Sequence, residues 1–210
     1  ETSPTQGRIY YFKNEGLSDL TFSLEHSEYL GAEIGLSLSP EFIDIDSDGD
    51  YDLFIGDYNG KINYYENTGT LTDPNFVDQG LLSNIDLGFF SIPEFSDLDG
   101  DNDYDMFIGS YSGGIYYFEN IGSPVEHNFV ESGFSIEGLS NINRTAPRFI
   151  DLDNDSDFDL VIGTEDSGLL LYWNTGDSNN YSFIKDKCVE IPFYGYNVKP
   201  WIGDIDNDHK

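Results

Sequence analysis

Five aspartates occupy alternate positions in one short stretch of the sequence, PEFIDIDSDGDYDLFIG, which runs from residue 40 to residue 56. Carboxylates placed this close together repel one another strongly unless a bound ion offsets their charge. Aspartate oxygens are also ligands that hard cations such as calcium prefer in proteins. The chemistry that this spacing favours is therefore the binding of a hard cation.

The same stretch returns further along the chain. PEFSDLDGDNDYDMFIG covers residues 93–109, PRFIDLDNDSDFDLVIG covers 147–163, and PWIGDIDNDHK at 200–210 begins a fourth copy. A solvated acidic turn could explain one such loop, but three copies in register weigh against that explanation. We therefore predict three complete metal sites and a fourth that is cut short, with these candidate ligands: Asp44, Asp46, Asp48, Asp50, Asp52, Asp97, Asp99, Asp101, Asp103, Asp105, Asp151, Asp153, Asp155, Asp157, Asp159, Asp204, Asp206 and Asp208.

The spacing within a copy is that of the start of an EF-hand loop. If the first aspartate is position one, the carboxylates at positions one, three and five can converge on one ion. Position seven can add its backbone carbonyl, and the aspartate at position nine can close the shell. At position six the chain must turn sharply, with backbone angles that are costly for residues with a Cβ. Gly49 suits this position, Asn102 tolerates it, and Ser156 suits it least. We therefore expect the third site to be the weakest.

A complete EF-hand is excluded, because position twelve is Ile55 instead of a glutamate and no helical pattern flanks the loop. Ligation entirely by oxygen favours calcium over zinc or copper, and flexible loop ligands favour calcium over magnesium. Calcium is therefore the predicted cofactor.

The segments that must position these loops have the pattern of short β-strands. Within one repeat, strands are expected at residues 41–44, 53–56, 61–66 and 75–77, and Asn59-Gly60 supplies the positive φ of a hairpin turn. The first aspartates of successive copies are 53, 54 and 53 residues apart. Four short strands in a repeat of this length are typical of a β-propeller blade, so the predicted fold class is all-β, with blades of four antiparallel strands.

Aromatic residues recur on the third strand of each repeat, as expected when a blade is sandwiched between two others. We assign this aromatic stripe to the core and not to a ligand platform. It comprises Tyr10, Tyr11, Tyr64, Tyr65, Tyr116, Tyr117, Tyr172 and Trp173.

The pattern DxDxDGDxDLFIG followed by GxIxYYEN resembles the FG-GAP and VCBS-type repeats, which are similar to the calcium-binding blades of integrin alpha-subunit propellers. The resemblance covers nearly all of the chain from Gly7 onward. It implies a β-propeller with calcium in the first hairpin of each blade. It also implies side-chain ligands at positions one, three, five and nine, with backbone carbonyls supplied by position seven. The family is known for adhesion, carbohydrate binding and accessory roles beside secreted enzymes.

The repeats predict a single β-propeller region over residues 1–210. Its expected parts are a partial blade at 1–36, complete blades at 37–90, 91–143 and 144–196, and a partial blade at 197–210. Propellers of this family typically have seven blades, which favours a piece of a larger ring. The alternative is a small four-bladed propeller.

The composition limits the partners of this region. A formal charge of -31, from 40 acidic and 9 basic residues, argues against binding to nucleic acid or to an anionic membrane. The content of hydrophobic residues, 38%, with 16% aromatic residues, is enough for a packed domain despite the acidity. Calcium loops suit the millimolar calcium outside cells, so we expect a secreted or cell-surface protein, with an oligomeric state that the sequence leaves open.

Residues suited to catalysis are few. His26, His127 and His209 are isolated, and neither HExxH nor GxSxG occurs, so enzymatic activity stays undecided and its absence is favoured. The favoured function is a non-catalytic adhesion module that binds a glycan or an extracellular protein. The alternative is the propeller portion of a secreted polysaccharide-degrading enzyme.

The segments that vary between repeats should lie on one rim of the propeller, where specificity usually resides. They are residues 27–39, 81–92, 137–146 and 190–199. Aromatic residues in or beside them are candidates for stacking on sugar rings or anchoring a protein partner. These candidates are Tyr29, Phe89, Phe90, Tyr194, Tyr196 and Trp201, although burial of Trp201 against the next blade is an equally good interpretation.

Overall fold

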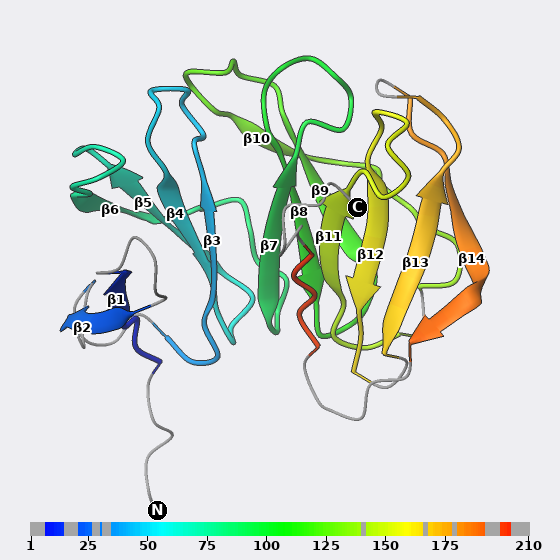
Figure 1. The fold of residues 1–210 in the computed structure, drawn as a ribbon, viewed down its shortest axis with the longest axis horizontal. Coiled ribbons are helices and arrows are strands. Elements are labelled where there is room, and N and C mark those ends of the chain that lie inside the picture. Colours follow the sequence, from blue (N-terminus) through cyan, green and yellow to red (C-terminus); the bar gives the residue numbers. More distant parts are fainter. Residues whose placement is uncertain are drawn as a thin grey trace, which may run out of the picture.

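The computed structural model describes residues 7–14, 21–26, 30, 35–139, 142–165, 168–177, 180–191 and 198–202, and all fourteen regular elements in them are β-strands (Figure 1). They form one two-stranded sheet and three four-stranded antiparallel sheets, in which consecutive strands are neighbours. The predicted all-β fold class, with blade-like sheets of four antiparallel strands, is confirmed. The candidates Tyr29, Tyr194 and Tyr196 lie outside the described residues.

Each four-stranded sheet corresponds to one copy of the repeat. The two-stranded sheet contains β1 (Tyr11–Asn14) and β2 (Phe22–His26). The first sheet contains β3 (Ser39–Ile43), β4 (Asp52–Gly56), β5 (Ile62–Asn67) and β6 (Phe76–Leu81). The second contains β7 (Ser91–Ser96), β8 (Asp105–Ser110), β9 (Ile115–Asn120) and β10 (Phe129–Ser132). The third contains β11 (Ala146–Ile150), β12 (Asp159–Gly163), β13 (Leu169–Asn174) and β14 (Phe183–Ile191).

The second strand of each four-stranded sheet is buried along its whole length. After its opening aspartate, its residues are apolar on both faces, as in residues 53–56 of β4, because the first and second sheets, and the second and third, pack against each other. The ring of Phe95 on β7 lies 4.7 Å from that of Phe54 on β4, and Phe149 on β11 lies 4.5 Å from Phe107 on β8. The first strands β7 and β11 therefore each pack on the second strand of the preceding sheet.

The glycine that ends each second strand lets the next sheet approach closely. A Cβ on Gly56 would lie 2.1 Å from the carbonyl oxygen of Ser91, and a Cβ on Gly109 would lie 2.0 Å from that of Thr145. No real side chain fits at these distances. The glycine that ends each Phe-Ile-Gly or Val-Ile-Gly step is thus required by the close packing between sheets.

The aromatic stripe lies mainly in the core, as predicted. Tyr64, Tyr65, Tyr117 and Tyr172 are buried, whereas Tyr10 is 52% exposed. The assignment of Tyr10 to the core is wrong. Its segment belongs to the two-stranded sheet, which in the described residues lacks counterparts of the first two strands of a blade.

Charged side chains of three first strands meet where these strands converge. The Arg148 guanidinium lies 3.0 Å from Glu41 of the first sheet and 2.9 Å from Glu94 of the second. The Lys199 ammonium donates to Ser39 and to the carbonyl oxygen of Pro40, at 3.2 Å each. Residues 198–202, which begin the fourth copy, therefore reach the first strand of the first sheet.

First strands that converge in this way are compatible with either predicted propeller, the piece of a larger ring or the small four-bladed one. The described strands do not close the ring, however, because the sheet of β1 and β2 is incomplete (Figure 1). This open arrangement fits a piece of a larger propeller.

Candidate metal centres

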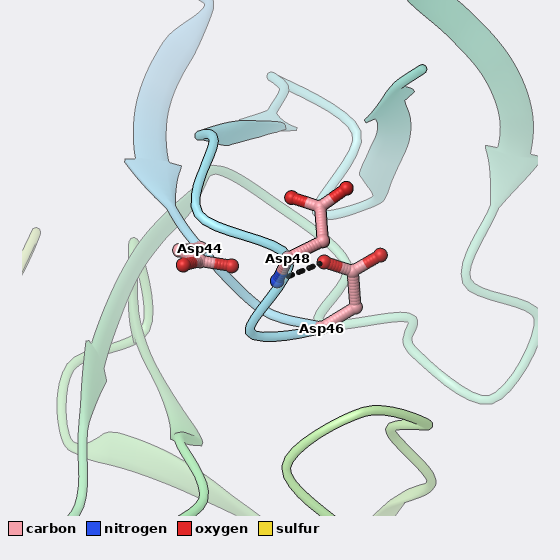
Figure 2. Close-up of side chains that lie close together, drawn as sticks. All are labelled: Asp44, Asp46 and Asp48. Carbon is pink, nitrogen blue, oxygen red and sulfur yellow. Dashed lines mark hydrogen bonds between the residues drawn. The ribbon is translucent and has the colours of Figure 1, made fainter. Parts of the chain in front are cut away.

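The predicted cation loops are the turns between the first and second strands of the three complete sheets. In each loop, one carboxylate oxygen from each of positions one, three and five lies within 4.8 Å of the other two. Figure 2 shows the three aspartates of the first loop on the turn that joins β3 to β4. The groups are Asp44, Asp46 and Asp48; Asp97, Asp99 and Asp101; and Asp151, Asp153 and Asp155. The fourth predicted group, Asp204, Asp206 and Asp208, lies outside the described residues.

Main-chain amides hold the loop carboxylates in place. The amide at position six donates to the aspartate at position one in all three loops, at 3.1 Å each time. The amide at position seven donates to the aspartate at position five, at 3.0 to 3.1 Å. Two of the converging side chains are thus oriented by the backbone of the loop itself.

The aspartate at position nine connects each loop to the third strand of its sheet. Asp52 is buried, and its two oxygens accept hydrogen bonds from the amides of Asn67, at 2.7 Å, and Ile45, at 3.4 Å. Asp159 makes the equivalent pair of bonds in the third loop. In the second loop, Asp105 accepts from the Asn120 amide, at 2.8 Å, and from the Tyr117 hydroxyl, at 2.9 Å. This aspartate therefore anchors the loop, and its role as a metal ligand stays a prediction.

The aspartate at position seven is buried in all three loops, and this burial was not predicted from the sequence. Asp50, Asp103 and Asp157 each have one carboxylate oxygen that is shielded from solvent and has no hydrogen-bond partner. A buried carboxylate oxygen without a partner is costly unless a cation or another donor compensates it. This feature fits a bound cation, and it makes the position-seven side chain a candidate ligand beside its backbone carbonyl.

The same burial makes the loops electrostatically unfavourable when no cation is bound. Burial, with smaller contributions from the neighbouring aspartates, raises the pKa of Asp103 to about 6. Burial also raises the pKa of Asp50 and Asp157, and again the neighbouring carboxylates add to the shift. A divalent cation among these groups would stabilise their ionised forms.

The backbone of the loops turns as predicted at position six. The φ angles of Gly49, Asn102 and Ser156 are 96°, 73° and 77°, all in the left-handed region. Position four is left-handed as well, with Ser47, Gly100 and Asn154 at 60°, 76° and 62°. This second turn was not predicted, although serine, glycine and asparagine at one position are a signal for it.

The comparison with protein families agrees with the loop geometry. The model of the FG-GAP-like repeat family matches residues 97–162 and 151–210, which together span more than half of the chain. The chain belongs to the FG-GAP-like repeat family. FG-GAP repeats often bind calcium and are typical of extracellular proteins. Neither the search of curated proteins nor the search of solved structures found a match for this FG-GAP protein.

Two other groups with functional potential have structural explanations. His127 packs between aromatic rings, 5.1 Å from Tyr64 and 5.2 Å from Phe129, and burial lowers its pKa. Glu94 at the convergence of the first strands is buried, which raises its pKa to about 7 despite Arg148. Within the part of the FG-GAP protein that the structure describes, no helix is long and apolar enough to cross a membrane.

Calcium should stabilise the protein more strongly at neutral than at acidic pH. The folded-state pKa of Asp103 lies above its usual value of 3.8, so without a cation the folded state binds protons more tightly and loses stability as pH rises through about 6. Calcium at about 100 times its dissociation constant would instead add roughly 2.7 kcal/mol per site once the carboxylates are ionised. Thermal unfolding with calcium or with EDTA, at about pH 5 and about pH 7.5, measures both effects. An equal melting temperature in calcium and EDTA at the higher pH would contradict the prediction.

Position six should tolerate glycine better than any other residue. A Cβ at Gly49 would have no atom within 4 Å, so Gly49→Ala tests the left-handed φ alone and should destabilise the protein by about 1–2 kcal/mol. Ser156→Gly removes the same strain and should stabilise the third loop and strengthen its calcium binding. Denaturant unfolding of both variants in calcium gives the two changes in free energy. Shifts of the same sign in the two variants would count against this account.

Proposed function

We propose that this chain is an extracellular, calcium-stabilised propeller module that binds a glycan or a protein partner and does no chemistry of its own. The observation that carries the proposal is an aromatic patch, which we define as Tyr58, Phe89, Phe90 and Tyr111 together with Arg144. These residues line a hollow of about 240 Å³. They come from the turns between second and third strands and from the connections between sheets. The cation loops lie at the opposite ends of the same strands.

The aromatic rings of the patch contact one another and still face solvent. The ring of Tyr58 lies 4.9 Å from Phe90, and Phe90 stacks on Tyr111 at 5.9 Å. The Arg144 guanidinium lies 4.5 Å from the centre of the Phe90 ring. Phe89 is 54% exposed and Tyr111 is 41% exposed. Exposed rings with an adjacent cation can stack on a sugar or receive a side chain of a protein partner.

The backbone beneath the patch is held in an unfavourable conformation. Phe90 and Arg144 occupy the same place in successive repeats, just before the first strand, with φ angles of 49° and 51°. Bulky residues rarely adopt this conformation, and glycine would adopt it without strain. Hydrogen bonds to the turn tyrosines hold it, since the Phe90 amide donates to the carbonyl oxygen of Tyr58 and the Arg144 amide to that of Tyr111. Strained bulky residues at partly buried positions beneath exposed rings support a functional role for the patch.

One further aromatic residue among the predicted binding candidates is exposed to solvent. Trp201 is 71% exposed, which favours its interpretation as a binding residue over burial against a neighbouring blade. The extracellular location rests on the calcium loops and on the family, whose repeats are typical of extracellular proteins. The identity of the ion as calcium rests on the all-oxygen ligands.

Binding should depend on the patch and not on exposed apolar residues elsewhere. Phe89→Ala should weaken binding by about tenfold or more, because truncating a central aromatic contact has effects of this size. Val125→Ala is the matched control, since Val125 is also exposed but lies in the turn between β9 and β10, at the end of the sheet that carries the cation loops. A glycan array and an extracellular-protein binding screen identify the ligand, and titrations compare the variants. Equal affinities of the two variants would contradict the role of the patch.

The alternative function is the propeller portion of a secreted polysaccharide-degrading enzyme. It would use scattered acidic residues on the rim, and a reducing-end assay on acidic polysaccharides tests it. Release of reducing ends that persists in purified protein would replace the proposal of a purely binding module.

A further inference from the structure

A large apolar hollow lies between the two-stranded sheet and the first four-stranded sheet. We call it the wedge; its volume is about 730 Å³ and its lining includes Tyr11, Phe12, Leu38, Phe42 and Leu71. Several of these side chains are unusually exposed for their size, Phe12 at 51% and Leu71 at 59%. A contiguous exposed apolar surface of this kind marks a place where another molecule or segment binds.

The repeats show what covers the same surface elsewhere in the molecule. Phe42 on β3, Phe95 on β7 and Phe149 on β11 hold the same place in successive copies. Phe95 and Phe149 are only 9% and 8% exposed, whereas Phe42 is 52% exposed. The difference arises because Phe95 packs on Phe54 and Phe149 packs on Phe107, each from the second strand of the preceding sheet.

The opposite wall of the wedge carries a tyrosine whose counterparts in the other repeats stack on a phenylalanine. Tyr11 on β1 corresponds to Tyr64 and Tyr117 in the repeat. Tyr64 stacks on Phe54 at 4.6 Å, and Tyr117 stacks on Phe107 at 4.8 Å. In both complete interfaces, one phenylalanine of a second strand therefore lies between a tyrosine of its own sheet and a phenylalanine of the next.

The two-stranded sheet stands where a preceding blade would stand. Gly7 and Gly60 are equivalent in the repeat, as are Gly35 and Gly88. Gly7 forms a bridge with Gly35, and a Cβ on Gly60 would lie 2.7 Å from the amide nitrogen of Gly88. The walls of the wedge are thus arranged like the walls of the two complete interfaces, with the place of one second strand between them.

We propose that the wedge binds the second strand of a further FG-GAP-like repeat, a β-strand with the pattern Asp-Leu-Phe-Ile-Gly. Its phenylalanine lies between Tyr11 and Phe42, and it pairs with β1 as β4 pairs with β5, where Phe54 is opposite Tyr64. Its glycine passes Leu38, which corresponds to Ser91 and Thr145, the residues that Gly56 and Gly109 abut. The sequence contains this strand once as DLFIG (52–56) and twice in related form, as DMFIG (105–109) and DLVIG (159–163), and all three copies are already built into sheets.

The test is a titration of the full chain, in calcium, with a labelled peptide that has the sequence of residues 50–57, DYDLFIGD. Saturable one-to-one binding and a higher melting temperature are expected. Two altered peptides, Phe54→Ser and Gly56→Ala, should bind more weakly by about tenfold or more, because each disrupts a packed contact at the centre of the interface. Equal binding of all three peptides would overturn the proposal.

Two protein variants locate the binding. Phe42→Ser should lose peptide binding, and Phe89→Ser, in the aromatic patch, should retain it. Circular dichroism and thermal unfolding show that both variants fold, which is expected because both phenylalanines are about half exposed. Absence of peptide binding to the folded wild-type chain would refute the proposal. A different result would also refute the proposal: the chain does not bind the peptide but forms concentration-dependent dimers, and Phe42→Ser abolishes these dimers. The wedge would then be the binding site for a second copy of the chain.

Discussion

The crowding of carboxylates in three nine-residue turns is the constraint on which the rest of this structure depends. Each turn joins the first two strands of a sheet, so its geometry fixes how those strands pair. Main-chain amides within the turn orient the aspartates at positions one and five, and the aspartate at position nine ties the turn to the third strand. Position seven brings a further carboxylate into the interior, where one oxygen lacks a partner. A cation is the simplest group that can compensate this concentration of buried negative charge.

The repeat assigns different tasks to the two ends of each sheet. The loop end is nearly the same in three copies, because its backbone angles and hydrogen bonds must be reproduced each time. The opposite end varies, with tyrosines at 58 and 111 replaced by Glu165, which lies 3.7 Å from Arg144. Between the two ends, the Phe-Ile-Gly step allows adjacent sheets to approach closely. A repeated frame with one variable end suits a binding module. At the wedge, where the second strand of a neighbouring blade is lacking among the described residues, apolar side chains that are buried in the other blades are exposed.

Much of this arrangement could be predicted from the sequence, because it depends on local spacing. The alternating aspartates predicted the loops. The predicted sharp turn at position six is confirmed by the positive φ angles of Gly49, Asn102 and Ser156. The inward position-seven side chains were missed, since burial depends on the third strand and on neighbouring sheets. The meeting of Arg148 with Glu41 was also beyond prediction, because it joins residues two repeats apart whose contact depends on the curvature of the whole assembly.

The most direct measurement of the central claim is the number of calcium ions bound by the chain. Isothermal titration calorimetry on protein stripped with a chelator should give one ion for each of the three complete loops, beside any held by the fourth copy. Asp99→Ala should remove one ion from that number, and Glu119→Ala, which changes an acid outside the loops, should leave it unchanged. A chain that binds no calcium, or the same number of ions in both variants, would contradict the account.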